Sequence, residues 1–225
     1  MKKISVVLMF LGTLFCVCLI ASNFLETKVI QLGVITVTAG MLIFPISYIL
    51  NDCIVEVWGY KKARLIIWLG FAMNFLVLIF GGLAALLPSP DYWEGEEAFN
   101  FVFGLAPRIT LASLAAFLIG SFLNAYIMSR MKVATKGRGF SLRAILSTIA
   151  GESADSIIFF PIAFAGLMPF NELVKMMIVQ ACLKTLYEII ALPITVRVVK
   201  IVKTKEGIDV FDDGISYGIF TIKDL

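Results

Sequence analysis

Long apolar segments separated by short polar ones occupy most of this chain. Each apolar segment is close to the 20 or so residues that a helix needs to cross the hydrocarbon core of a bilayer. The pattern predicts six such spans, at about residues 4–22, 29–50, 63–87, 109–129, 145–167 and 173–196. The expected fold class is an all-α membrane protein built as a six-transmembrane-helix bundle. Residues 1–205 would form this transmembrane domain and residues 206–225 a polar tail.

A short internal match favours a plan in two halves. Residues 41–50 are MLIFPISYIL and residues 157–167 are IIFFPIAFAGL, so IFPI in the second span corresponds to FFPI in the fifth. With three spans in each half, corresponding spans run in opposite directions, as in transporters with inverted repeats. The sequence therefore suggests two inverted three-helix halves.

Composition narrows the class of protein. The 225 residues are 60% hydrophobic with a mean hydropathy of +0.96, well above an ordinary soluble domain. Histidine, the commonest metal ligand and general base, is absent, and the four cysteines show neither metal-site nor disulfide spacing. We expect no catalytic residue, metal or cofactor. The net charge of +3 is dispersed among apolar runs, which does not indicate a nucleic-acid partner.

Basic residues predict the orientation, because loops rich in lysine and arginine stay on the cytoplasmic side. Six spans place both termini on one side, and most basic residues fall on that side, which makes both termini cytoplasmic. The polar segment 88–108, which contains Asp91 and Glu94 among aromatic residues, is then an external loop with an interfacial segment. The basic residues assigned to the cytoplasmic side are Lys2, Lys3, Lys61, Lys62, Arg64, Arg130, Lys132, Lys136, Arg138, Arg143, Arg197, Lys200, Lys203 and Lys205, against Lys28, Arg108 and Lys175 outside.

Two carboxylates lie well inside the fifth span. Glu152 and Asp155 are three residues apart, which places them on one helix face, and Phe159 continues the same stripe. Each ionised group costs roughly 2.5 to 3.5 kcal/mol near a bilayer centre, so the pair must face protein, water or a partner charge. We interpret this face as one wall of a solute site, where Phe159 could stack on a flat ring.

Other polar side chains inside the spans extend this candidate site. Gln180, Lys184 and Glu188 recur every four residues, so Lys184 can pair with Glu188 on its own helix or with Glu152 or Asp155 across the bundle. Interhelical hydrogen bonds and an ion pair that only fix packing are the competing interpretation. The candidate substrate-binding residues are Asp155, Glu152, Asn124, Gln180, Lys184, Glu188 and Phe159; Asn51, Asp52 and Glu56 are candidates for a gate or simply the cytoplasmic end of the second span.

Several segments together resemble one known family. They are PISYILNDCIVEVWGYKKARLIIWLGF, RITLASLAAFLIGSFLNAYIMSRMK, LRAILSTIAGESADSIIFFPIAFAG and the tail segment VFDDGISYGIF. The most specific pieces are D-x-x-x-E-V-W-G-Y-K at 52–61 and S-T-x-x-G-E-x-x-D-S-x-I-F at 147–159. The chain resembles the queuosine precursor transporter family, also called the VUT family. It departs from the family pattern at Glu152 and Ala154, where glutamine and a branched residue are commoner.

This resemblance implies a multi-pass transporter of the bacterial inner membrane. Its small-molecule deazapurine substrates would be 7-cyano-7-deazaguanine and 7-aminomethyl-7-deazaguanine, which are precursors of queuosine in tRNA. A guanine-like edge presents a ring N–H and an NH2 group side by side, and a carboxylate can accept both. Asp155 is the expected acceptor, while Asn124 and Gln180 could contact the remaining polar atoms of the ring.

Two other functions compete with a secondary transporter. The first is a substrate-binding membrane subunit of an energy-coupling-factor-type vitamin or nucleobase uptake system. The chain lacks the phosphate-binding pattern G-x-x-x-x-G-K-[ST], so that system would need separate ATPase chains as partners. The second is an intramembrane aspartyl enzyme using Asp52 and Asp155. It needs these two carboxyl groups within hydrogen-bond reach, yet Asp52 is predicted at the cytoplasmic end and Asp155 deeper. The preferred deazapurine, the coupling ion and whether the protein forms a homodimer stay open.

Overall fold

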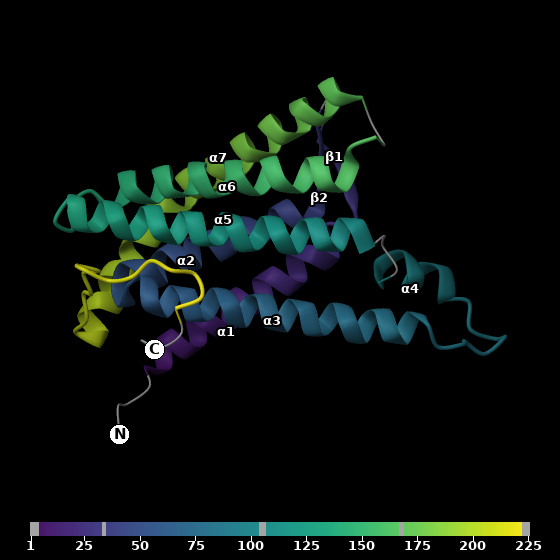
Figure 1. Ribbon diagram of the computed structural model, residues 1–225, viewed down its shortest axis with the longest axis horizontal. Coiled ribbons are helices and arrows are strands. Elements are labelled where there is room, and N and C mark those ends of the chain that lie inside the picture. Colours follow the sequence, from purple (N-terminus) through teal and green to yellow (C-terminus); the bar gives the residue numbers. More distant parts are fainter. Residues whose placement is uncertain (1–4, 33–34, 104–106, 167–168, 222–225) are drawn as a thin grey trace.

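The computed structural model describes residues 5–32, 35–103, 107–166 and 169–221, which form an elongated helical bundle (Figure 1). Helices α5 and α6 run side by side in opposite directions, and α7 packs against α6 and α2. The elements in chain order are α1 (Val6–Leu25), β1 (Val29–Leu32), β2 (Ile35–Thr38), the 3-10 helix η1 (Ala39–Leu42), α2 (Phe44–Trp58), α3 (Tyr60–Ala85), α4 (Glu96–Phe103), α5 (Pro107–Ala134), α6 (Phe140–Phe164) and α7 (Phe170–Glu206).

Helix α2 lies at the centre of the bundle, where it packs against α1, α3, α5 and α7. Of its 15 residues, 13 are buried. Pro45 lies in its first turn, where a missing N–H costs no helical hydrogen bond. Gly59 ends it with a φ of 80°, a left-handed conformation that suits glycine, and α3 begins at the next residue. The central helix is therefore short and defined at both ends.

Within the described ranges, four helices are long and apolar enough to cross a membrane: α1, α3, residues 111–134 of α5, and α6. Their bounds agree closely with the predicted spans at 4–22, 63–87, 109–129 and 145–167. The structure therefore supports a multi-pass membrane protein. It does not confirm six crossings, because α2 has 15 residues and α7 carries Lys184 and Glu188 in its middle.

The prediction of a continuous second span at 29–50 is wrong. Val29–Leu32 and Ile35–Thr38 instead pair as antiparallel strands, with Val29 opposite Thr38, and η1 and then α2 follow. Isoleucine, valine and threonine make up all four residues of β2 and two of the four residues of β1, and these β-branched side chains fit a pleated strand better than a helix. Hydropathy alone did not distinguish this apolar hairpin from a helix.

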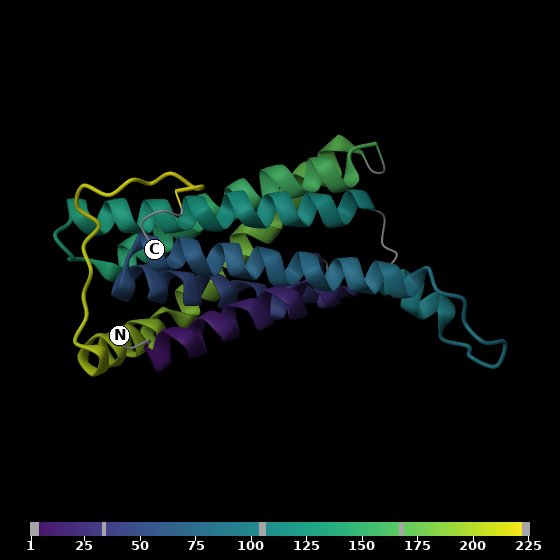
Figure 2. The same ribbon diagram turned by 60° about the horizontal axis from the view of Figure 1, so that its bottom comes forward.

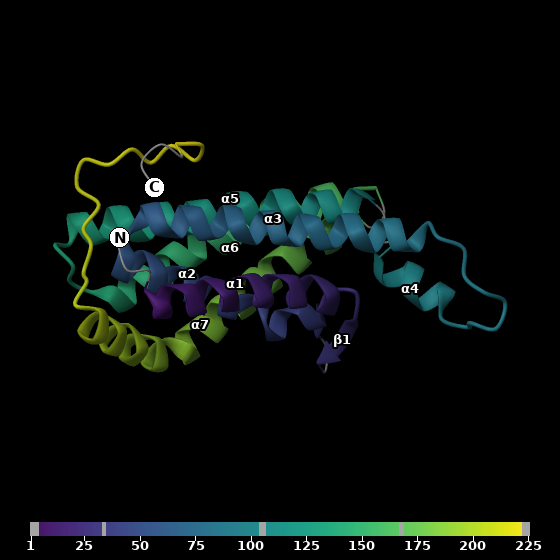
Figure 3. The same cartoon turned by 90° about the horizontal axis from the view of Figure 1, so that it is seen from below.

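The sixth predicted span, 173–196, corresponds to a longer helix. Helix α7 has 37 residues and continues to Glu206, ten residues beyond the predicted end. Pro193 lies inside it, and proline removes one helical hydrogen bond. Figure 3 shows α7 crossing the bundle obliquely and changing direction toward its C-terminal end. That change brings the basic last turns of α7 back toward α2.

Two glycines allow α5 and α6 to approach closely. A Cβ atom at Gly120 would lie 2.9 Å from Gly151 O, and one at Gly151 would lie 2.9 Å from Gly120 O. Tyr48 of α2 packs against the same crossing, since a Cβ atom at Gly151 would also lie 2.7 Å from Tyr48 Cε1. Gly120 and Gly151 thus let the two helix backbones come into direct contact.

Gly151→Ala is expected to destabilise the protein by about 1 to 3 kcal/mol, because the added methyl group must displace backbone and the Tyr48 ring. Thermal unfolding of the purified protein in detergent measures the effect. Gly82→Ala in α3 is the matched control, since a Cβ atom there meets nothing within 4 Å. Equal melting temperatures for Gly151→Ala and Gly82→Ala would show that the crossing tolerates the extra volume.

Candidate functional site

The interior of the bundle is polar where α2, α5, α6 and α7 meet. Each of these helices contributes side chains that are at most 7% exposed, although burying polar groups is costly unless they are paired. The polar interior comprises Tyr48, Asn51 and Asp52 of α2, Asn124 of α5, Ser147, Thr148, Glu152, Asp155 and Ser156 of α6, and Gln180, Lys184 and Glu188 of α7.

Lys184 is the cation of this polar interior. Its Nζ atom lies 2.9 Å from Glu152 Oε2 and 3.4 Å from Asp155 Oδ2, so the ion pairs cross from α7 to α6. The same atom lies 3.8 Å from the centroid of the Phe44 ring, a cation–π contact with α2. Of the two pairings that the sequence left open, the structure has the one across the bundle. Three helices thereby converge on one buried ammonium group.

Asn51 and Asp52 are buried in the middle of α2, whereas the second span as predicted would have ended just before them. Asn51 Nδ2 donates to Asn124 Oδ1 over 2.8 Å and to Ser121 O over 3.3 Å. Ser147 Oγ donates to Asp52 Oδ1 over 3.4 Å, and Asp52 is fully buried. The misplacement follows from the wrong second span, because α2 begins at Phe44 and these residues are in its middle.

Many polar atoms of the interior have no hydrogen-bond partner in the described structure. An unsatisfied buried polar group costs about 1 to 3 kcal/mol, so native proteins contain few of them. Here they cluster on the four helices of the polar interior, which favours a site for a polar solute over simple packing. The atoms are Tyr48 Oη, Asn51 Oδ1, Asp52 Oδ2, Asn124 Nδ2, Thr148 Oγ1, Glu152 Oε1, Ser156 Oγ and Glu188 Oε2.

One of the predicted binding residues, Phe159, has different surroundings from those expected. The Phe159 ring contacts Phe160 and Phe164, at centroid distances of 5.3 Å and 5.9 Å, and the aromatic ring at Lys184 is Phe44 instead. Gln180 is buried one helical turn before Lys184, as its spacing predicted.

Sequence reasoning missed Glu26, Phe44 and Tyr48. Glu26 follows α1 and interacts electrostatically with Lys184 and Asp155. In the sequence, Glu26 is a single acidic residue between the first two predicted spans, so nothing pointed to a role in the site. Phe44 lies within the IFPI match, and Tyr48 is one turn before Asp52 on α2. These positions in the sequence could have identified both residues as candidates for the site.

A second buried cluster surrounds Glu56, near the end of the bundle that carries the α5–α6 turn. Arg143 binds the Glu56 carboxylate with two hydrogen bonds of 2.6 Å and 3.1 Å, the two-pronged geometry that makes such pairs strong. Lys203 of α7 binds the same carboxylate over 2.6 Å. Glu56 is only 1% exposed, so it does not lie at the surface. The cluster joins α2, α6 and α7.

The C-terminal segment 207–221, which lies within the predicted polar tail, packs on this end of the bundle (Figure 2). Asp209 pairs with Lys132 over 2.5 Å and with Lys203 over 2.8 Å. Burial alone would raise the pKa of Asp209, but hydrogen bonds from the two lysines outweigh it and hold that pKa below its usual value. The segment is thereby attached to α5 and α7.

Asp212 fixes the same segment to the start of α3. Its Oδ2 atom accepts hydrogen bonds from Tyr60 N over 2.8 Å and Ser129 Oγ over 2.5 Å. A carboxylate at a helix N-terminus satisfies a free N–H group and interacts favourably with the helix dipole. Further along, Arg64 donates to Gly218 O over 2.7 Å. The tail thus connects α3 and α5 at this end.

These features define a class: a multi-pass membrane protein with a closed polar interior suited to a small solute. The family model described as "Putative vitamin uptake transporter" matches residues 38–198, and the chain belongs to this family. The family consists of transporters and not of enzymes, which removes the aspartyl enzyme from consideration. The matched region extends from β2 through most of α7 and includes the whole polar interior.

Individual relatives carry a more specific name. The chain is 28% identical over 189 residues to the "Probable queuosine precursor transporter" of Bacillus subtilis (strain 168), covering 83% of this chain and 82% of that protein. It is 26% identical over 173 residues to the "Queuosine precursor transporter" of Escherichia coli (strain K12), covering 76% of each. A protein of Haemophilus influenzae with the Bacillus protein's name is 30% identical over 127 residues, covering 56% of this chain and 52% of that protein. No solved structure matches the chain.

Proposed function

We propose that this protein imports queuosine precursors, namely 7-cyano-7-deazaguanine and 7-aminomethyl-7-deazaguanine, across the bacterial inner membrane for tRNA queuosine modification. The names of the relatives support this substrate class. The observation that carries the proposal is the buried Asp155–Lys184–Glu152 group, set among unpartnered polar atoms within the region 38–198 that matches the family model.

Asp155 is the proposed acceptor for the guanine-like edge. Its carboxylate is held 3.4 Å from Lys184, compared with 2.9 Å for Glu152, so Asp155 is the less tightly bound of the two. A carboxylate can accept the ring N–H and the NH2 group of one substrate in a paired arrangement. Lys184 then offers an ammonium donor to a ring carbonyl oxygen, since all its polar hydrogens are donors.

Other side chains complete the proposed binding site. Phe44 provides a flat apolar wall in place of Phe159, because its ring already lies against Lys184. The amides of Asn124 and Gln180 contact the remaining ring atoms, and Asn124 Nδ2 is buried without a partner. Glu152 holds Lys184 in position.

The Glu56 cluster is the proposed cytoplasmic gate. Arg143 and Lys203 bind Glu56 from two other helices, and the tail closes over them through Asp209. Release of substrate on this side requires these helices to separate and therefore these ion pairs to break. Asn51 and Asp52, grouped with Glu56 in the sequence, lie deeper and are excluded from the gate.

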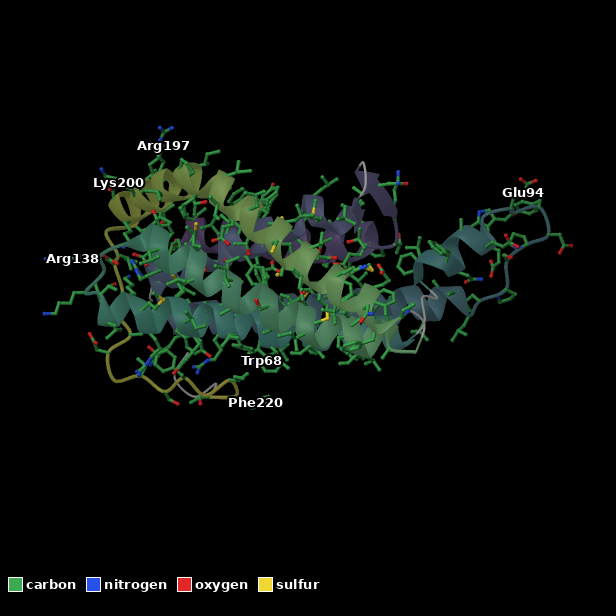
Figure 4. All side chains as sticks on the ribbon, turned by 90° about the horizontal axis from the view of Figure 1, so that it is seen from above. Trp68, Glu94, Arg138, Arg197, Lys200 and Phe220 are labelled. Carbon is green, nitrogen blue, oxygen red and sulfur yellow. The ribbon has the colours of Figure 1, made fainter. Side chains whose placement is uncertain are left out.

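The proposed orientation has six crossings and both termini in the cytoplasm. The hairpin with α2 supplies the second crossing, and α7 the sixth. Figure 4 places Arg138, Arg197 and Lys200 at one end of the molecule and Glu94 at the other. Because basic residues favour the cytoplasmic side, the end with Arg138 faces the cytoplasm.

Cysteine labelling tests this orientation. In a variant whose four native cysteines are replaced by alanine, Glu96→Cys should react with a membrane-impermeant maleimide added to intact cells. Lys136→Cys, in the α5–α6 turn, should react only after the membrane is permeabilised. The opposite pattern would reverse the orientation and every loop assignment.

Queuosine formation in cells tests the substrate. A bacterial strain that lacks precursor synthesis and its own transporter is complemented with this gene and fed one precursor at a time. Queuosine in tRNA should appear at low external precursor only with the gene. Equal queuosine with the empty vector would contradict the proposal for that precursor.

A further inference from the structure

Two carboxyl groups of the polar interior are neighbours: Asp52 on α2 and Glu188 on α7, two helices that pack against each other. Their exposed fractions are 0% and 2%. Ser147 Oγ donates to one oxygen of Asp52, while Asp52 Oδ2 and Glu188 Oε2 have no donor. Two ionised carboxylates offer only acceptors to each other, so a proton between them is the simplest group that satisfies both.

The cations nearest this carboxyl pair are bound elsewhere. Lys184, one turn before Glu188, is held by Glu152 and Asp155. Like charges at short distance in a buried site disfavour ionisation of both groups, as in paired-carboxylate enzymes. The other titratable groups around the pair are Tyr48, Cys53 and Glu56 on α2, Glu152 on α6, and Arg143, which with Lys203 is bound to Glu56.

Two neutral side chains beside the pair are also without partners. Thr148 lies next to Glu188 and Asn124 next to Asp52, and both are at least 99% buried. Thr148 Oγ1 and Asn124 Nδ2 have no hydrogen-bond partner. The Thr148 hydroxyl can donate or accept a hydrogen bond, and the Asn124 amide can donate one. Together they can form hydrogen bonds with the carboxyl pair whether or not it holds a proton.

We propose that Asp52 and Glu188 share one proton and that its uptake and release drive solute import. Glu188 is one helical turn from Lys184, and Asp52 one turn from Glu56, so the pair lies between the proposed substrate site and the proposed gate. The coupling to import rests on the proposed function, whereas the shared proton does not. A proton enters from the outside with the substrate, binds the pair, and leaves to the cytoplasm when the gate opens.

The shared proton is tested without any substrate. Infrared difference spectra of the purified protein at neutral and alkaline pH should show a protonated-carboxyl band that Asp52→Asn removes. Glu172→Gln is the control, since Glu172 is exposed at the start of α7, and it should leave the band unchanged. A parent protein without a band that depends on Asp52 would overturn the proposal.

Coupling is tested in proteoliposomes with 7-cyano-7-deazaguanine, no sodium and no membrane potential. A one-unit pH gradient, acidic outside, should let the parent protein accumulate the substrate about tenfold, the ratio equivalent to one proton per molecule. Asp52→Asn should bring the internal concentration only to the external one. Accumulation driven by a sodium gradient at equal pH, or full accumulation by Asp52→Asn, would overturn the coupling. A parent that moves no deazapurine would instead contradict the proposed function, and the infrared result would still decide the shared proton.

Discussion

Lys184→Met should destabilise the protein by about 3 to 5 kcal/mol, the largest effect that we expect from a single substitution, because removing one partner of a buried ion pair leaves its charge uncompensated. Here two carboxylates lose their cation at once, since Lys184 contacts both Glu152 and Asp155. The free energy of unfolding in detergent measures the loss, and uptake should fall with it.

Two further variants separate this explanation from a general effect of removing lysine. Lys184→Met combined with Glu152→Gln removes charges of both signs and should recover much of the lost stability. Lys175→Met is the control, because Lys175 and Glu172 form an exposed ion pair, with side chains 68% and 57% exposed, that is worth at most about 1 kcal/mol. If Lys184→Met changes neither stability nor uptake, Lys184 does not hold the buried carboxylates.

Asp155→Asn should weaken precursor binding by roughly tenfold or more. The amide NH2 group replaces one acceptor and faces a substrate donor, and an unsatisfied buried polar group costs about 1 to 3 kcal/mol. Asparagine is nearly the same shape as aspartate and costs less to insert in a membrane, so expression should be retained. Binding is compared at matched membrane abundance, by titrating labelled precursor against purified protein.

Glu152→Gln provides the comparison on the same helix face. Its effect on binding should be smaller, because glutamine still offers a carbonyl acceptor to Lys184. An Asp155→Asn protein that binds as well as the parent would contradict the assignment. The substrate site would then have to be sought at Glu188 and Lys184.

Hydrophobic periodicity predicted the long helices and the polar stripe of α6 correctly. These features are local, since a run of apolar residues defines a span and three-residue spacing places Glu152 and Asp155 on one face. The same reasoning failed for β1 and β2, where β-branched residues give a high hydropathy but form paired strands. Composition over a window does not distinguish these two structures.

The contacts that complete the site join residues far apart in the chain, so spacing could not predict them. Asn51 and Asn124 are 73 residues apart, and Asp212 binds Tyr60 N across 152 residues. The sequence did not predict that the tail packs on the bundle, because single side chains such as Asp209 and Asp212 attach it. Lys184 was singled out because a lysine inside an apolar helix needs a partner, but the choice among three carboxylates required the fold.

Uptake by the purified chain alone tests the central claim most directly. Liposomes containing only this protein, with a pH gradient imposed and no ATP or other protein present, are offered radiolabelled 7-cyano-7-deazaguanine or 7-aminomethyl-7-deazaguanine. We predict uptake that saturates, that is competed by the other precursor, and that Asp155→Asn abolishes at low substrate concentration. No uptake by well-folded protein, or uptake only after ATPase chains and ATP are added, would contradict a self-sufficient transporter of queuosine precursors.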